Sequence, residues 1–138
     1  MKANGKYGEV FAAILVLGAA FYFLYSKGII FANFESVGAK TAYEMIRKKP
    51  DIVVLDVRTE EEYTNDGHLE NARLLPLQRI EKEPDLLDSF KGKTLLVYCR
   101  SGHRSVAAAR ILNKLGIEAI NLEGGINAWK REGLPVIR

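Results

Sequence analysis

The chain has a single cysteine among its 138 residues, and this scarcity limits what it can build. With Cys99 alone, no internal disulfide can form and no zinc site with several cysteine ligands can be assembled. The chain also lacks a large excess of either charge. Its net charge is only +3, which argues against a dedicated nucleic-acid binder with a clustered basic face. Internal repeats and low-complexity tracts are absent. The hydrophobic content of 48% is instead typical of a globular chain with a core.

Charged side chains are missing from residues 10–26, a run of 17 residues between Glu9 and Lys27. As a helix this run reaches about 25 Å, slightly less than a ~30 Å hydrocarbon core. It is apolar on every face, which disfavours a buried helix of a soluble protein. A membrane anchor through residues 10–26 is therefore the leading interpretation. A cleaved signal peptide is the alternative, although its apolar region is usually shorter.

The orientation of this segment depends on few charges. Lys2 and Lys6 precede the apolar run and Lys27 and Lys40 follow it, so the positive-inside count is tied. The similarity of this N-terminal segment to a signal sequence favours export. We therefore expect a membrane-anchored single-pass protein or an exported one, with its catalytic domain outside the cytoplasm, in the periplasm.

The rest of the chain is expected to form one domain, residues 37–138, behind a segment 1–36 that ends in a short tether at 33–36. Short apolar runs there alternate with amphipathic stretches, and Thr59 with Glu62 matches a capping box that opens a short helix. Further helices are expected at 39–49, 83–90, 105–115 and 126–131, and strands at 52–55, 72–77, 94–98 and 119–122. This alternation predicts an α/β fold of three layers, α/β/α, with a mostly parallel central sheet.

Cys99 follows the strand expected at 94–98, at the sheet edge where ligands of such folds sit. The loop from Cys99 to Arg104 can curl so that its N–H groups converge on the sulfur, and Gly102 supplies the backbone freedom for that turn. The following helix N-terminus, Arg100 and Arg104 add positive potential, with His103 a further candidate. These features favour the thiolate, which is the nucleophilic form of cysteine.

Several motifs in order resemble the rhodanese (thiosulfate sulfurtransferase) family, from about residue 37 to residue 136. They are Asp56-Val57-Arg58, Glu61-Glu62-Tyr63, Gly67-His68, the loop Cys99-Arg100-Ser101-Gly102-His103-Arg104-Ser105, Leu122-Glu123-Gly124-Gly125-Ile126 with Trp129, and Gly133-Leu134-Pro135-Val136. The chain departs from the family pattern after His68. Leu69-Glu70-Asn71-Ala72 stands where the family has isoleucine and a Pro-Gly pair before alanine, a change expected to alter a turn.

The resemblance implies a rhodanese-like fold and a two-step sulfur transfer without a cofactor. Cys99 would take the outer sulfur of a small anionic donor such as thiosulfate and pass it from a persulfide to cyanide, a thiol or a protein cysteine. The loop would cradle that persulfide and bind the donor through its residues Arg100, Ser101, Gly102, His103, Arg104 and Ser105. Asp56 and Arg58 are expected to support the loop as a strand-end ion pair.

Two other functions stay open at this level. A cysteine phosphatase also holds a thiolate in a backbone cradle, but with five residues between cysteine and arginine where this loop has four, Arg100 to His103. A membrane-tethered sulfur carrier or interaction module, without turnover of its own, is the second alternative. His68 is interpreted as a turn or packing residue and Trp129 as a core anchor, and a metal site at Cys99 with the two histidines is disfavoured.

Overall fold

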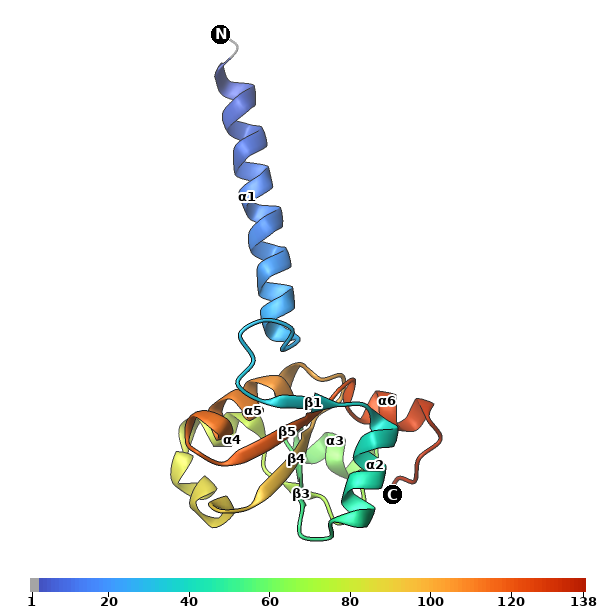
Figure 1. Cartoon of the computed structure of the whole chain (residues 1–138). Helices are drawn as coiled ribbons and strands as arrows, with labels where there is room; N and C mark the ends of the chain where they lie inside the picture. The colour runs from blue at the N-terminus through green and yellow to red at the C-terminus, as the bar shows by residue number, and fades with distance from the viewer. Residues whose placement is uncertain (1–2) are drawn as a thin grey trace. The chain divides into compact units, whose positions relative to one another are not determined.

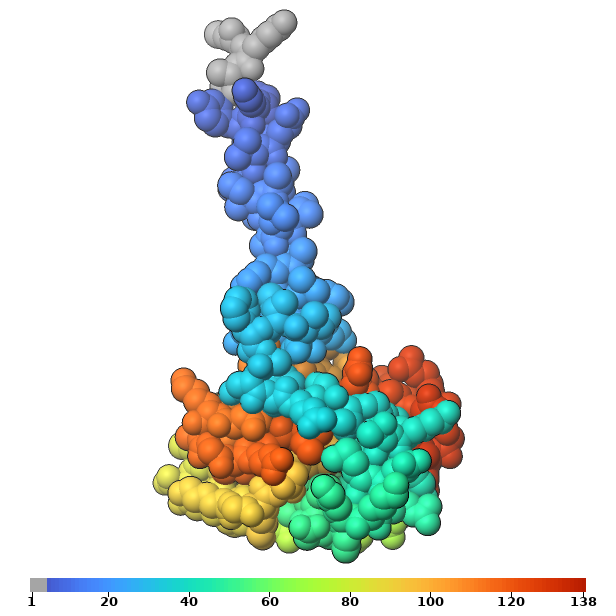
Figure 2. Space-filling model, viewed as in Figure 1, coloured from blue at the N-terminus to red at the C-terminus, as the bar shows by residue number. Residues whose placement is uncertain are grey.

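The structure, a computed structural model, describes residues 3–138 and divides the chain into two compact units, residues 1–32 and 33–138. Lys2, one of the charges in the orientation count, lies outside the described residues. The first unit consists of helix α1 (Ala3–Ser26), of which Gly5–Ser26 is long and apolar enough to cross a membrane or to act as a signal sequence. Large apolar side chains of this helix, among them Phe11, Leu17 and Phe23, are exposed. Figure 2 shows the helix as its blue segment.

The second unit is a five-stranded sheet between layers of helices (Figure 1). Its strand order is β1-β5-β4-β2-β3 and all four strand pairs are parallel. The elements are β1 (Glu35–Val37), α2 (Ala39–Lys48), β2 (Val53–Asp56), α3 (Glu60–Asn65), β3 (Arg73–Leu74), α4 (Leu77–Lys82), the 3-10 helix η1 (Pro84–Phe90), β4 (Thr94–Tyr98), α5 (His103–Lys114), β5 (Glu118–Leu122) and α6 (Gly125–Arg131). The expected three-layer α/β/α fold with its N-terminal apolar helix is confirmed.

The central strand β4 explains why the sheet is covered on both faces. Successive side chains of a strand point to opposite faces, and every residue from Leu95 to Tyr98 is buried. Leu95 and Val97 join a core with α4, η1 and α5, whereas Leu96 and Tyr98 join a second core with α2 and α6. Trp129 is fully buried in the second core, so its expected role as an anchor is confirmed.

The expected tether at 33–36 is wrong in its second half, because Glu35 and Ser36 belong to β1. This strand pairs with β5 through Glu35–Ile120 and Ser36–Asn121, and Figures 1 and 2 show it at the surface beside β5. Only its last residue, Val37, is buried. A three-residue strand with polar side chains carries too little hydrophobic pattern to be recognised in the sequence.

Apart from shifts of one residue at the ends of other helices and strands, three further regions differ from expectation. The strand expected at 72–77 is limited to Arg73–Leu74, and Pro76 caps an unexpected helix, α4, instead. The helix expected at 83–90 is the 3-10 helix η1. Helix α5 begins at His103 rather than at Ser105, so the turn that follows Cys99 is tighter than the sequence suggested.

Candidate active site

Cys99 lies directly after β4, at the carboxyl edge of the sheet, with 1% of its surface exposed. Two groups of the following turn contact its sulfur. The N–H of Gly102 donates to Sγ at 3.1 Å, and the hydroxyl Oγ of Ser105, at the start of α5, lies 3.4 Å from Sγ. A thiolate at this position is therefore stabilised by donors that the backbone and α5 hold in place.

The start of α6 holds the backbone of this turn through hydrogen bonds. Ile126 N–H donates to the carbonyl oxygen of Cys99 at 2.9 Å, and Asn127 N–H donates to that of Arg100 at 3.1 Å. A Cβ on Gly125 would overlap both carbonyl groups, so the two segments approach this closely only because residue 125 is glycine. The carbonyl groups are thus directed into α6, away from the sulfur.

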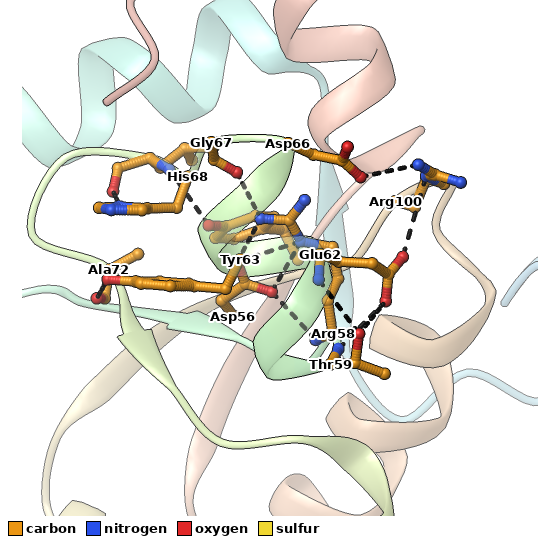
Figure 3. Close-up of polar contacts among 12 residues, drawn as sticks. Asp56, Arg58, Thr59, Glu62, Tyr63, Asp66, Gly67, His68, Ala72 and Arg100 are labelled. Atoms are coloured by element: carbon orange, nitrogen blue, oxygen red, sulfur yellow. Dashed lines mark hydrogen bonds and ion pairs between the residues drawn. The ribbon is translucent and has the colours of Figure 1, made fainter. Parts of the chain in front are cut away.

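Carboxylates of α3 and its C-cap face the two arginines of the loop. Figure 3 shows the contacts of Arg100 with Asp66 and Glu62. Arg104 makes a double hydrogen bond to Glu62, with Nη1–Oε2 at 2.6 Å and Nη2–Oε1 at 2.7 Å. Arg100 donates to Asp66 Oδ2 at 2.7 Å, and its Nε lies 3.8 Å from Glu62 Oε1. The sequence predicted that these arginines bind an anionic donor, and in the structure both already have anionic partners.

Glu62 also closes the capping box that the sequence predicted. Its carboxylate accepts from the backbone N–H of Thr59 at 3.1 Å, and its own N–H donates to the Thr59 hydroxyl at 3.2 Å. The hydrogen bonds from Arg104, stronger than the opposing effect of burial, lower the pKa of Glu62 to about 2. Glu62 is consequently ionised at neutral pH and held by both the helix cap and Arg104.

Asp56 and Arg58 form an ion pair with no exposed surface, beneath the loop segment 66–68. The Arg58 guanidinium donates to Asp56 Oδ2 at 2.7 Å and to the carbonyl of Gly67 at 2.7 Å, as Figure 3 shows. It also lies over the ring of Tyr98. Burial, together with the nearby Asp56 carboxylate, raises the pKa of the Tyr98 phenol. This cluster ties the end of β2 to the chain after α3, the helix that supplies Glu62.

His68 packs within a turn, as the sequence predicted. Its ring stacks on Tyr63 with centroids 3.9 Å apart, and its backbone forms an antiparallel bridge with Ile137. Within residues 3–138, no three His, Cys, Asp or Glu side chains are arranged to hold a metal ion. The histidine therefore fixes a turn and the C-terminal segment.

Of the loop residues singled out in the sequence, the structure places Gly102 and Ser105 against the sulfur. Ser101 and His103 have exposed side chains on the rim. The sequence did not indicate Glu62 and Asp66 as part of the site. Their pairing with the loop arginines spans 42 and 34 positions, and the capping box already accounted for Glu62.

Comparison with known proteins agrees with this geometry. The family model of the rhodanese-like domain matches residues 38–132. An uncharacterized protein of Synechocystis sp. is 37% identical over 101 residues, which are 72% of this chain and 55% of that protein. A sulfurtransferase of Allochromatium vinosum is 31% identical over 104 residues, covering 75% of this chain and 94% of its own.

A solved structure shows the same architecture. The crystal structure of a rhodanese-related protein from Thermoplasma volcanium superposes with a TM-score of 0.67 at 34% identity, over 75% of this chain and 98% of that one. The strand order, the cysteine at the carboxyl edge of β4 and the extent of the match point to one family. The chain belongs to the rhodanese-like domain family.

Proposed function

We propose that this protein is a sulfurtransferase that carries a sulfane sulfur as a persulfide on Cys99. In the first step the Cys99 thiolate attacks the outer sulfur of a small anionic donor such as thiosulfate. A bond forms between Sγ and that sulfur, the S–S bond of the donor breaks, and its electron pair leaves with sulfite. In the second step a cyanide, thiol or protein-cysteine acceptor attacks the outer sulfur, and Cys99 returns as a thiolate.

The position of the sulfur is the observation that carries this proposal. Cys99 Sγ has a backbone donor at 3.1 Å and a hydroxyl at 3.4 Å, and its carbonyl group is held by α6 on the other side. Donors held in place in this way stabilise negative charge without rearrangement during the reaction. The family membership and the relatives named as sulfurtransferases support the same chemistry.

Each residue of the loop has a distinct place in this proposal. Gly102 N–H and Ser105 stabilise the thiolate before attack and the persulfide after it. The exposed Ser101 and His103 lie on the rim where a donor or acceptor approaches. Arg100 and Arg104 are the two cations that the loop itself offers to an anionic donor. No cofactor is required, because sulfur itself is the transferred group.

Steady-state turnover of thiosulfate and cyanide tests the enzymatic proposal. We expect thiocyanate formation that is lost in Cys99→Ser and reduced in Ser105→Ala. A persulfide on Cys99 with negligible turnover would instead support a sulfur carrier that acts only with its protein partner. Hydrolysis of phosphate esters that depends on Cys99, without sulfur transfer, would support a phosphatase.

We also infer that α1 anchors the domain to a membrane as a single span, with the catalytic domain outside the cytoplasm. The support is the length and apolar composition of Gly5–Ser26. Extraction of cell membranes with alkaline carbonate tests the anchor, because a spanning helix resists it. Mass spectrometry of the extracted chain should find residues 1–32 present, and their removal would identify a cleaved signal instead.

A further inference from the structure

The charges around the active loop cancel in an unexpected way. Arg100 and Arg104 are the loop's two guanidinium groups, and Glu62 and Asp66 lie within 2.6–2.7 Å of them. The four groups together contribute no net charge. The positive charge that the sequence placed on the two loop arginines is therefore balanced by carboxylates, and the ammonium group of Lys130 lies nearby, 2.8 Å from the carbonyl oxygen of Asp66.

Glu62 holds its position independently of Arg104. The helix cap fixes its carboxylate through the Thr59 N–H and hydroxyl, both at 3.1 Å, and only 18% of the side chain is exposed. Its low pKa, about 2, keeps it ionised at neutral pH. An anionic donor that approaches Arg104 must therefore compete with a carboxylate that is already in place.

We propose that Glu62 determines which donors the protein prefers, by disfavouring dianionic donors such as thiosulfate relative to monoanionic ones such as alkyl thiosulfonates. This inference rests on the proposed sulfur transfer at Cys99. Both donors react in the same way: Sγ bonds to the terminal sulfur, the S–S bond breaks, and the electron pair leaves with sulfite or with a sulfinate. The donors differ by one unit of charge and by one substituent, an alkyl group in place of an oxygen, so each variant is compared with the unmodified protein on the same two donors.

The physical reason is that the second negative charge of thiosulfate gains attraction only from unbalanced positive charge. A bidentate carboxylate on Arg104 removes most of that gain, since opposite charges so close together are nearly neutral to a third charge. A monoanionic donor carries one negative charge fewer and therefore loses less of this attraction. Glu62 acts through Arg104 and is thus a specificity-determining residue rather than a catalytic one.

The test compares thiosulfate with methanethiosulfonate in Glu62→Gln. Glutamine still completes a capping box, so the variant removes the charge and keeps the cap. We expect the kcat/KM for thiosulfate to rise about fivefold relative to that for methanethiosulfonate, as one unit charge near the site predicts. The gain should shrink at high ionic strength. Asp66→Asn should change the ratio in the same direction, and Arg104→Ala in the opposite one.

Glu60→Gln is the matched control, because Glu60 lies in the same first turn of α3 with an exposed side chain. It should leave the ratio unchanged. The loss of a unit charge predicts a change of more than about twofold in the ratio of kcat/KM for thiosulfate to that for methanethiosulfonate. A smaller change in both Glu62→Gln and Asp66→Asn would overturn the inference.

A second measurement separates this inference from the proposed function. Alkylation of Cys99 by anionic iodoacetate and by neutral iodoacetamide reports the potential at the sulfur without any sulfur transfer. Glu62→Gln should raise the iodoacetate rate relative to the iodoacetamide rate. If no donor forms a persulfide but this ratio rises, the sulfur-transfer proposal fails and the role of Glu62 in setting the charge stands. If donors react but neither ratio changes, the inference alone fails.

Discussion

Gly125 lies directly against Cys99, so closely that a Cβ at residue 125 would overlap the carbonyl oxygen of the cysteine. The two residues are 26 positions apart in the sequence. The contact allows Ile126 N–H to hold that carbonyl at 2.9 Å. The position of Cys99 therefore depends on the backbone of α6 as much as on its own loop.

Gly125→Ala is expected to displace the loop and to slow sulfur transfer. Displacements on the order of 1 Å reduce rates about 100-fold. Gly116→Ala is the control: residue 116 also has a positive φ, 78°, but no atom lies within 4 Å of its Cβ position. Both variants carry about 1–2 kcal/mol of backbone strain, and only Gly125→Ala should lose activity. Equal activities in the two variants would contradict the role assigned to this contact.

Asp56→Asn is expected to lower the free energy of unfolding by about 3–5 kcal/mol, because it leaves the Arg58 charge buried without its anionic partner. Urea unfolding at neutral pH measures this. Asp51→Asn, on the surface of the same domain, should change the free energy by less than about 0.5 kcal/mol. A small effect in Asp56→Asn would mean that the ion pair does not brace the chain around Gly67.

Stability is expected to decrease in acid partly through Glu62. Its pKa in the folded protein, about 2, lies below the value of 4.5 for a free glutamate. The stabilisation is therefore complete above about pH 5 and is lost as the pH falls toward 2. With allowance for the exposed part of the side chain, its size is about 1–2 kcal/mol. Urea unfolding as a function of pH should show a shallower decline in the free energy of unfolding for Glu62→Gln than for Glu60→Gln. Identical slopes for the two variants would contradict this contribution of Glu62.

Asn71 stands where the family pattern has glycine, in the segment whose turn the sequence was expected to alter. Its φ is 58°, in the left-handed region that asparagine tolerates better than most residues. We expect Asn71→Ala to lower the free energy of unfolding by about 1 kcal/mol, because alanine lacks the side-chain oxygen that helps asparagine adopt this conformation. Asn71→Gly should retain the stability, and a loss in both variants would show that the side chain has another role.

The elements predicted from the sequence were those with strong local patterns. The runs Val53–Leu55 and Leu95–Tyr98 are continuously apolar, and the helix after Cys99 is amphipathic. The glycine after Leu115 closes that helix. The two elements that were missed lack such a pattern. β1 has one buried residue, and α4 has six residues with one buried side chain, Ile80.

The site was predictable only in part for a related reason. Cys99, Gly102 and Ser105 are local to one loop, and their spacing indicated their proximity. The carboxylates that neutralise the loop arginines come from α3, and only the packing of that helix beside the carboxyl edge of β4 brings them there. Local sequence patterns carry no direct signal for such pairs.

Mass spectrometry of the intact protein after incubation with thiosulfate, or with an alkyl thiosulfonate, tests the central claim most directly. The account predicts a gain of one sulfur atom, located at Cys99, that is removed by cyanide and absent in Cys99→Ser. A protein that stays at its original mass with both donors while its cysteine remains a free thiol would contradict it.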